Sequence, residues 1–394
     1  MVIRADTGTV SDKKGHIAYK YRIYPDSDQA VFLAQSFGCV RFVYNFYLDV
    51  CIQCREYGFK HPSKTECNDD CNQKLKDAYP WLRVPDKFAL TNAIFALDNA
   101  FSRFFSGQNN YPVFKKKGVS RDSYKTDYTN GNIEIGDNYI KLPKAGKVKA
   151  VIHRRPEYSR YNGLKLKSAT VSREKDGSYY CSVLFAYDAG ETVIPDIPLE
   201  ECAGLDYKSD GLYVDHEGYM PGSPKFFRKM QKKLAREQRR LSRMEKDSSN
   251  YKKQKLRIAR IHRAIANARQ SFLRQAAAAI AKRFRLVCVE DLDMKAMSNK
   301  GFVLGKSTMD NGWGMFLKYL EEALAKRGGM LVKISRWYPS TQTCSHCGSR
   351  KIMQLDERTY VCPHCGKTID RDWNSAINIR EEGYRLYCEV RQAA

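Results

Sequence analysis

The sequence feature that most constrains this chain is a pair of Cys-x-x-Cys motifs near its C-terminus. At this spacing, two tight turns can direct four thiolates at one tetrahedral zinc ion, and a glycine, Gly348 or Gly366, follows directly after each motif. Four cysteines can also be small buried apolar side chains, but paired motifs that each end in glycine favour metal binding. The sequence therefore predicts a structural zinc ribbon with the ligands Cys344, Cys347, Cys362 and Cys365.

Two aspartates, Asp370 and Asp372, follow the ribbon at the start of a predicted helix over residues 373–380. Acidic side chains at a helix N-terminus interact favourably with the helix dipole. One interpretation is that one aspartate caps the helix and that both are solvated. The alternative is that one of them binds a metal ion together with acids from elsewhere in the chain.

The charge of the chain points to a polyanionic partner. Lys and Arg number 68 against 44 Asp and Glu, giving a formal net charge of +24, and the 12% of aromatic residues argues against a solvated disordered tail. The basic residues crowd into residues 225–285, and nucleic acid is the first candidate for their partner. A membrane surface is not favoured, because no run of about 18 apolar residues occurs. The candidates in this stretch for contacts to a nucleic-acid backbone are Lys232, Lys233, Arg239 and Arg240.

The length of 394 residues is enough for two or three domains, each with its own core. The first residues contain no apolar segment of a secretory signal, so we expect the protein to stay in the cytoplasm. Its 13 cysteines are then expected to be reduced thiols or metal ligands, since the cytosol is reducing.

The first half of the chain changes between β and helical patterns. Residues 16–25 alternate apolar and polar side chains, as in a strand. Apolar residues recur at helical spacing over residues 27–57 and again over residues 86–105. Residues 124–188 contain short alternating runs separated by Asn-Gly, Asp-Gly and Gly-Asp, which predicts a small antiparallel barrel or sheet. If the first strand joins it, the helical block is an insertion into a β domain.

Two further motifs in this half have open interpretations. The first is a set of cysteines that could form a second metal site: Cys51, Cys54, Cys67 and Cys71. The first two fall within a predicted helix and no glycine follows them, so buried thiols are the alternative. The second motif, YPVFKKKG, combines aromatic residues with lysines and suits either a sugar-phosphate backbone or a solvated loop. Its candidate contacts are Lys115, Lys116 and Lys117.

Three acids lie at the ends of predicted elements in the second half. Asp206 is near the end of a strand, Glu290 ends the apolar run LVCVE, which is typical of a buried central strand, and Asp372 begins the last helix. Each acid alone could be an ordinary solvated residue. Beside a basic surface, three carboxylates at one sheet edge could hold two Mg²⁺ ions about 4 Å apart for phosphodiester cleavage. Thiol or imidazole ligands would favour softer metals.

An ordered set of motifs extends over almost the whole chain: YRIYP, GCVRFVYN, DKFAL, PVFKKKG, GLDY, VEDL, GWG, PSTQTCSHCG and DRDWNSAINI. In this order they resemble the TnpB family of transposon-encoded, RNA-guided DNA endonucleases, which is thought to be ancestral to type V CRISPR effectors. The resemblance implies an α/β plus β-barrel fold class. Its parts would be a RuvC-like nuclease domain of RNase H fold with an inserted zinc ribbon, and a β-barrel wedge domain interrupted by a helical recognition lobe.

The resemblance also implies functional residues and partners. Asp206, Glu290 and Asp372 would bind Mg²⁺ and catalyse cleavage, with Asp370 as the second choice for the third acid. The partners would be a guide RNA transcribed from the transposon end and a double-stranded DNA target that carries a short adjacent motif. Family members place contacts to that motif at the positions of Lys87, Phe88, Thr91 and Asn92.

The expected segments are the first wedge strand (1–26), the recognition lobe (27–118), the rest of the wedge barrel (119–190), a linker (191–200), the nuclease domain (201–340), the zinc ribbon (341–369) and the final nuclease segment with the C-terminal helix (370–394).

Two places depart from the family pattern. Asp206 is followed by Tyr-Lys-Ser, where many relatives have a glycine after the acid and its neighbour. Ser271 and Arg274 stand where relatives carry an acid and a histidine, which affects local packing or nucleic-acid contacts but leaves the three acids intact. Two alternative functions stay open. One is an RNA-guided DNA-binding regulator that does not cut, and the other is a zinc-ribbon transposase or strand-transfer enzyme that recognises transposon ends without a guide.

Overall fold

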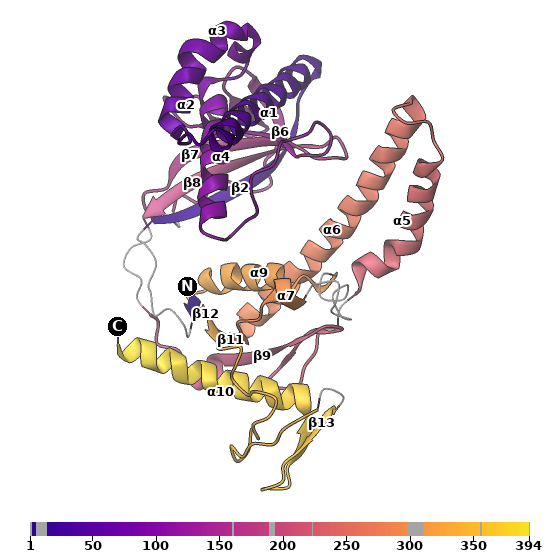
Figure 1. Ribbon diagram of the computed structural model, residues 1–394. Coiled ribbons are helices and arrows are strands. Elements are labelled where there is room, and N and C mark those ends of the chain that lie inside the picture. The colour runs from indigo at the N-terminus through magenta and orange to yellow at the C-terminus, as the bar shows by residue number, and fades with distance from the viewer. Residues whose placement is uncertain are drawn as a thin grey trace. The chain divides into compact units, whose positions relative to one another are not determined.

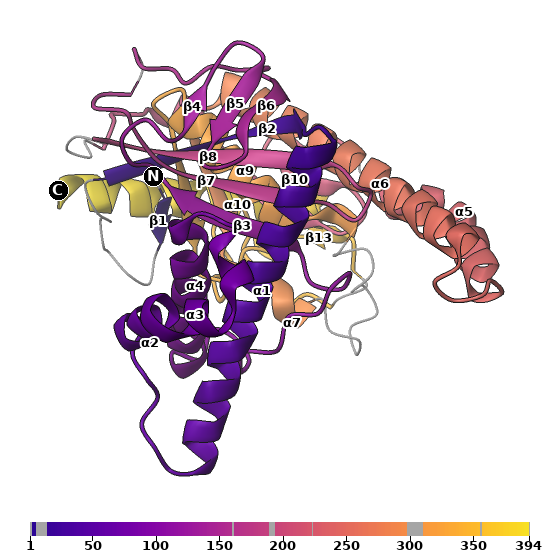
Figure 2. The same ribbon diagram turned by 90° about the horizontal axis from the view of Figure 1, so that it is seen from above.

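The computed structural model describes residues 2–4, 14–159, 161–188, 194–222, 224–297, 310–354 and 357–393. The chain divides into two compact units, one formed by residues 12–191 and the other by residues 1–11 together with residues 192–394. Figures 1 and 2 show the elements of both units in two perpendicular views. Each unit buries its own clusters of hydrophobic side chains.

The unit of residues 12–191 contains a seven-stranded antiparallel sheet. The strand order is β3-β7-β8-β2-β6-β5-β4. The two long strands β2 and β8 pair near its centre, from Lys14 opposite Asp188 to Ile23 opposite Tyr179. The strands are β2 (Lys14–Tyr24), β3 (Asp122–Asp127), β4 (Glu134–Ile135), β5 (Tyr139–Leu142), β6 (Gly146–Val151), β7 (Lys165–Arg173) and β8 (Tyr179–Asp188).

This sheet is open in the part of the chain that the structure describes. β3 and β4 are its edge strands and do not pair with each other, so the antiparallel sheet agrees with the sequence prediction but the closed barrel does not. Helix α4 (Lys87–Phe105) contacts the edge strand β3 through side chains. The carboxylate of Asp86, which caps α4, accepts a hydrogen bond from Thr126 Oγ1 of β3 at 3.0 Å.

The helices of this unit are inserted between β2 and β3 in the chain. α1 (Ser27–Glu56) begins at a capping box formed by Asp26 and Gln29, and α4 begins at Asp86. Both helices bury their apolar side chains in the same cluster as the sheet. Between them lie α2 (Lys64–Asp70), η1 (Cys71–Leu75), α3 (Lys76–Ala78) and η2 (Pro80–Arg83).

The second unit is built on a five-stranded mixed sheet with the order β1-β12-β11-β9-β10. β10 is antiparallel to β9, and the other neighbours are parallel. The pairing of β1 with β12 was not predicted from the sequence. The strands are β1 (Val2–Arg4), β9 (Cys202–Lys208), β10 (Leu212–Asp215), β11 (Leu286–Glu290) and β12 (Met330–Ile334).

Helices cover both faces of this sheet. Successive strand residues point to opposite faces, and both sets are apolar and buried. Val287 and Val289 pack in a cluster with α6 and α9, whereas Leu286 and Cys288 pack in a cluster with α10. Figure 1 shows α10 lying along the sheet. These helices are α6 (Ser249–Arg283), α9 (Trp313–Ala325) and α10 (Arg371–Gln392).

Helix α10 lies very close to the sheet because two glycines leave room for it. A Cβ atom on Gly204 of β9 would lie 2.0 Å from Ala376 O and 2.5 Å from Arg380 N, both in α10. A Cβ atom on Gly383 of α10 would lie 2.3 Å from Cys288 Sγ in β11. Larger residues at these two positions would force the helix away from the strands.

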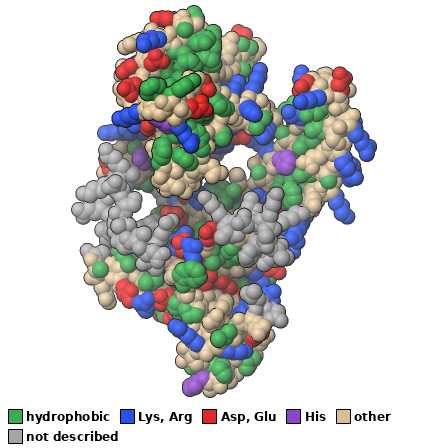
Figure 3. Space-filling view, viewed as in Figure 1, with side chains coloured by type: hydrophobic (Ala, Val, Ile, Leu, Met, Phe, Trp, Pro, Cys, Tyr) green, Lys and Arg blue, Asp and Glu red, His purple; other side chains and the backbone are tan. Residues whose placement is uncertain are grey.

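A basic helical hairpin extends from the second unit (Figure 1). It consists of α5 (Phe226–Ser242) and α6, whose 35 residues span about 50 Å. Gln254 Nε2 crosses between the two helices and donates to Glu237 O at 3.0 Å and to Glu237 Oε2 at 2.8 Å. Lys and Arg side chains are visible along the outer edge of the hairpin in Figure 3.

The remaining described elements are short: η3 (Leu199–Glu201), α7 (Met294–Met297), and β13 (Thr359–Val361) with β14 (Thr368–Asp370), which pair in the zinc-ribbon region. Among the helices described, none combines the length and the apolar character that a membrane span requires.

Candidate active site, zinc ribbon and nucleic-acid surface

Strand register brings Asp206 and Glu290 side by side. β9 and β11 are parallel neighbours in which Leu205 lies opposite Val289. The next step of this register aligns Asp206 with Glu290. Two positions earlier, the Cβ direction of Gly204 on β9 and the side chain of Cys288 on β11 face α10. Strand residues alternate between the two faces, so both acids face α10 as well.

Helix α10 supplies the third acid. Asp370 caps the helix, because its Oδ1 accepts from the backbone N–H of Asp372 at 2.9 Å and of Trp373 at 3.0 Å. Asp372 lies in the first turn, is 8% exposed, and its charge acts on Asp206. The two aspartates of the pair therefore differ: Asp370 is the cap, and Asp372 joins the acids of the sheet.

The three carboxylates have different electrostatic surroundings. Burial raises the pKa of Asp206, which is 9% exposed, well above its usual value, and the charges of Glu290 and Asp372 raise it further. Burial also raises the pKa of Glu290. Burial of Asp372 acts in the same direction, but Lys208 and Arg371 outweigh it and hold the pKa of Asp372 below its usual value. Asp206 and Glu290 therefore repel each other, whereas Lys208 and Arg371 compensate the charge of Asp372.

The base of the ribbon, residues 340–343, holds Glu290 in place. Ser340 Oγ donates to Glu290 Oε1 at 2.6 Å. Asn378 Nδ2 donates to Ser340 O and to Thr343 O, both at 2.7 Å, and Asn374 Nδ2 donates to Thr343 O, also at 2.7 Å. Helix α10 is thereby tied to the segment before the ribbon, and through it to Glu290.

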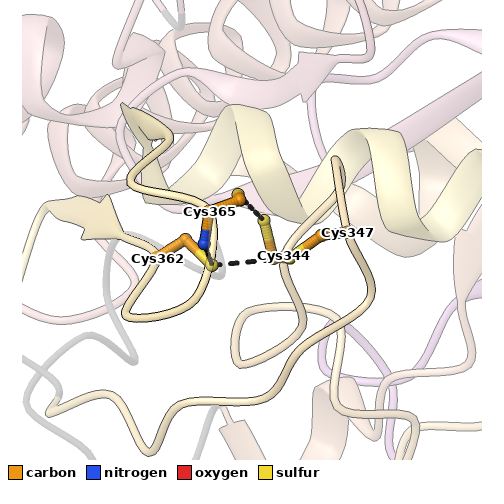
Figure 4. Close-up of side chains that lie close together, drawn as sticks. All are labelled: Cys344, Cys347, Cys362 and Cys365. Atoms are coloured by element: carbon orange, nitrogen blue, oxygen red, sulfur yellow. Dashed lines mark hydrogen bonds between the residues drawn. The ribbon is translucent and has the colours of Figure 1, made fainter.

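The four cysteines of the predicted ribbon come together (Figure 4). The Sγ atoms of Cys344 and Cys365 are 3.7 Å apart, those of Cys347 and Cys362 are 3.6 Å apart, and all four lie within 4.8 Å of one another. A tetrahedral zinc ion with Zn–S bonds of about 2.3 Å separates its sulfur ligands by about 3.8 Å. The glycine after each motif has a φ of +72° or +71°, as a tight turn needs. Ligand type and spacing fit a structural zinc ion.

The second set of cysteines does not form such a group. Cys51 and Cys54 lie in α1, Cys67 in α2 and Cys71 in η1. Within the described ranges, only the ribbon has three or more His, Cys, Asp or Glu ligand atoms all within 4.8 Å of one another. Burial raises the pKa of Cys51 to about 11 and that of Cys67 to about 12, which keeps them as thiols. These observations favour the interpretation as core thiols.

The three acids are spread more widely than the four cysteines of the ribbon. At least one pair among Asp206, Glu290 and Asp372 is separated by more than 4.8 Å, since they do not form such a group.

The residues predicted to contact the adjacent DNA motif occupy the first turns of α4: Lys87, Phe88, Thr91 and Asn92. Lys87 is exposed, and its Nζ lies 5.1 Å from the centre of the Phe88 ring. Thr91 Oγ1 donates to Asn68 Oδ1 at 2.8 Å, and Asn92 Nδ2 donates to Asp127 Oδ2 at 3.0 Å. The polar groups of Thr91 and Asn92 are therefore engaged within their own unit, and Lys87 is the accessible cation.

Lys115 differs from the two lysines that follow it. Lys116 and Lys117 are exposed, whereas Lys115 Nζ lies 3.6 Å from the centre of the Tyr44 ring. Burial lowers the pKa of Lys115 to about 8. Its backbone is fixed by Asn45, which donates to Lys115 O at 2.9 Å and accepts from Lys115 N at 2.8 Å. Lys116 and Lys117 are thus better placed than Lys115 to meet a phosphate.

The basic residues predicted on the hairpin are all exposed: Lys232, Lys233, Arg239 and Arg240. A hollow of about 440 Å³ in α5 and just beyond it is lined by Arg236, Arg239, Arg240, Arg243 and Met244. Several guanidinium groups around one hollow form a surface that suits phosphate groups.

The departures on α6 concern helix packing. The guanidinium of Arg274 lies 3.9 Å from the centre of the Tyr319 ring, and its Nη1 is 3.9 Å from Glu322 Oε2, both on α9. Ser271 Oγ accepts from Gln275 Nε2 at 3.1 Å on the same helix. Neither residue alters the three acids.

Several residues that shape this site were not predicted from the sequence. Lys208 lies two positions after Asp206, a spacing that places both on one strand face. Asn374 and Asn378 are polar residues four apart on one helix face, an unusual pattern that could have identified them. Ser340 has no local sequence pattern that distinguishes it.

Three family models match parts of the chain. They are described as "Helix-turn-helix domain" over residues 15–58, "Probable transposase" over residues 199–300, and "Cas12f1-like, TNB domain" over residues 313–379. The first covers β2 and α1, the second covers β9 to α7, and the third covers α9, β12, the ribbon and the start of α10.

Curated proteins and solved structures match over greater lengths. A Streptomyces pristinaespiralis protein named "Putative RNA-guided DNA endonuclease" is 30% identical over 368 residues, which is 93% of this chain and 89% of the relative. "Putative RNA-guided DNA endonuclease InsQ" of Escherichia coli K12 is 30% identical over 386 residues, 94% of this chain and 92% of the relative. A structure named "Cryo-EM structure of the Cas12f1-sgRNA-target DNA complex" aligns with 94% of this chain and 99% of that chain, with a TM-score of 0.48 and 12% identity. The sequence similarity to both curated relatives spans nearly the full length of each pair.

Proposed function

Because this chain belongs to the TnpB family of transposon-encoded, RNA-guided DNA endonucleases, we propose that it cuts DNA at a RuvC-like site formed by Asp206, Glu290 and Asp372. One observation carries the proposal. Three acids from β9, β11 and α10 converge on the same face of one sheet, in a chain with a formal net charge of +24. The mixed sheet with a helix packed over its acids supports an RNase H type of nuclease domain.

The donor set suits Mg²⁺, which prefers carboxylate oxygens and water. The mutual repulsion of Asp206 and Glu290 favours a cation between them. When bound, two Mg²⁺ ions would activate a water molecule and stabilise the leaving oxygen of a phosphodiester. Asp206, Glu290 and Asp372 would hold the ions, and Ser340 would keep Glu290 in its orientation.

The basic hairpin and the helical insertion would hold the nucleic acids. Base pairing between a guide RNA and the target strand would read the sequence, while the protein supplies positive charge and the cut. Arg239 and Arg240 on the hairpin are exposed and suited to backbone phosphates. Lys87 at the start of α4 is the accessible candidate for the contact to duplex DNA beside the target.

The test is to purify the protein with RNA expressed from its own flanking DNA. The complex is then given Mg²⁺ and a plasmid library with a guide-matched target beside randomised bases. We expect bound RNA and cutting beside one motif. Asp206→Ala should lose cutting but keep RNA and target binding, whereas Asp210→Ala, an exposed acid four residues later, should still cut. Persistent cutting by Asp206→Ala would reject the assignment of this site.

The same assay separates the alternatives. RNA and target binding without cutting by the unmodified protein would indicate an RNA-guided regulator. Specific binding of transposon-end DNA by protein that carries no RNA would indicate a transposase or strand-transfer enzyme.

A further inference from the structure

A lysine occupies the proposed catalytic site. Lys208 lies two residues after Asp206 in β9, so its side chain leaves the strand on the face that α10 covers. Its Nζ lies 2.9 Å from Asp372 Oδ2, and the lysine side chain is only 23% exposed. Asn311 Nδ2 donates to Lys208 O at 2.8 Å and fixes the backbone at this point. The ammonium group is therefore held among the acids.

Both oxygens of Asp372 are occupied by cations of the chain itself. Arg371 Nε and Nη2 lie 3.2 Å and 3.1 Å from Asp372 Oδ1, while Lys208 Nζ contacts Oδ2. A Mg²⁺ ion binds a carboxylate oxygen directly at about 2.0–2.1 Å, and each such oxygen has two lone pairs, so a hydrogen bond alone does not block it. The ammonium group 2.9 Å from Oδ2 would instead lie close to a Mg²⁺ ion on that oxygen and repel it. Asp372 would therefore bind Mg²⁺ more tightly when one of the two cations moves away.

Lys208 is the cation that can give way. Arg371 is also anchored elsewhere, because its Nη1 donates to Glu357 O at 2.9 Å. A guanidinium with several fixed contacts resists displacement, whereas a lysine ends in a single charged group on a flexible four-carbon stem. The backbone of Lys208 stays on the strand that carries Asp206, so its charge remains close to the site after it has moved.

We propose that Lys208 is a positioning residue that serves as the counter-ion of Asp372 in the metal-free protein and competes with Mg²⁺ for that carboxylate. This inference rests on the proposed nuclease site. While the ammonium group lies on Asp372 Oδ2, its charge opposes the binding of a cation to that carboxylate. Lys208 therefore raises the Mg²⁺ concentration at which the site fills, and it holds Asp372 in place until then.

The test measures metal binding rather than cutting. Tb³⁺ is titrated into the full-length, zinc-loaded protein free of nucleic acid, with luminescence excited through Trp373, which directly follows Asp372, and Mg²⁺ is then used to displace it. Lys208→Met removes the charge and keeps the length. It should bind Mg²⁺ about tenfold and Tb³⁺ about thirtyfold more tightly, the repulsion expected for a divalent and a trivalent ion about 6 Å from an ammonium group in water. Lys208→Arg keeps the charge and should stay within about twofold of the unmodified protein.

Two further variants make the result specific. Lys351→Met removes an ion pair of similar length, 3.0 Å to Glu357 in the ribbon, and should not change the binding of either ion. Lys208→Gln provides the same comparison if the methionine variant does not fold. Unchanged or weaker ion binding in the folded, uncharged variant would overturn the role of Lys208.

Asp206→Asn distinguishes this inference from the proposed function. If Asp206→Asn loses Tb³⁺ binding while Lys208→Met binds like the unmodified protein, only the role of Lys208 is wrong. If Asp206→Asn binds Tb³⁺ unchanged, the acids are not a metal site, and the proposed function fails together with the inference. In the cutting assay, Lys208→Met should reach half of its maximal rate at about tenfold lower Mg²⁺.

Discussion

Replacing Gly204 by alanine should damage the proposed site without changing any of its acids. The added Cβ would lie 2.0 Å from Ala376 O and 2.5 Å from Arg380 N, which are backbone atoms of α10. Cβ atoms essentially never approach such atoms within 3.0 Å, so β9 and α10 must separate by about 1 Å. Asp372 lies about one helical turn before Ala376 and should move with the helix.

The expected magnitude follows from this contact. Overpacking a core typically costs about 1–3 kcal/mol, and a backbone neighbour yields less easily than the end of a flexible side chain, so we expect about 3 kcal/mol. For a unit of about 200 residues, this lowers the melting temperature by roughly 6–12 °C. A shift of about 1 Å in a catalytic group costs about 100-fold in rate, so cutting should fall by that factor even where the protein is fully folded.

Thermal unfolding monitored by circular dichroism, and the cutting rate measured well below the melting temperature, test the two parts separately. Gly38→Ala is the matched control, because Gly38 lies inside α1, where an added Cβ would meet no atom within 4 Å, and alanine favours a helix by up to about 1 kcal/mol. It should be neutral or stabilising and cut normally. If Gly204→Ala unfolds within about 0.5 kcal/mol of the unmodified protein and cuts at the same rate, the argument from close packing is refuted.

Three further predictions address the acids, the ribbon and the hairpin. Asp206→Asn should abolish cutting yet stabilise the protein in Mg²⁺-free buffer by about 0.5–2 kcal/mol, measured by urea unfolding. This gain should grow as the pH rises, because an acid whose pKa is raised by folding destabilises the folded state above its unfolded pKa and not below it. Cys362→Ser should reduce cutting more than guide-RNA binding, compared in cleavage and filter-binding assays, because the base of the ribbon holds Glu290. Arg239→Gln and Arg240→Gln should each lower the slope of log Kobs against log salt concentration by about 0.7–0.9, measured by titration at several salt concentrations, without changing the preferred target.

The acids of the site could be predicted because short segments mark their positions. A continuous apolar run identifies β11 as a buried strand and ends at Glu290, and the spacing of Asp370 and Asp372 at a helix start indicated that one of them caps the helix. The register between neighbouring strands, in contrast, cannot be predicted from any single segment. The alignment of Leu205 with Val289 joins residues more than 80 positions apart, and only the packed sheet determines it.

The closure of a sheet and the pairing of very short strands could not be predicted either, because both depend on contacts between segments that are far apart in the sequence. Alternating runs predicted the antiparallel sheet of residues 12–191, but a closed barrel also requires the two edge strands, β3 and β4, to pair with each other, and the pattern of neither strand encodes that pairing. β1 has three residues, too few to show a period of two, and its partner β12 lies more than 300 residues later in the chain.

Gly204 and Lys208 were missed because their roles depend on a helix that arrives from the other end of the sequence. In β9 alone, Gly204 is an ordinary weak strand residue and Lys208 an ordinary strand-end cation. Their importance arises only when α10 lies close enough to contact one and to place Asp372 against the other.

The negative charges of the three carboxylates in the proposed site are compensated unevenly. This suggests an order in which two metal ions would bind. Both positive groups, Lys208 and Arg371, contact Asp372, whereas Asp206 feels only the more distant charge of Arg371 and is repelled by Glu290. A first cation near Asp206 and Glu290 would relieve that repulsion and meet no competing ammonium group. A second cation that uses Asp372 would be repelled by Lys208, so the two binding events should differ in affinity. The lysine would then keep the site incomplete at low Mg²⁺ even when its first ion is bound.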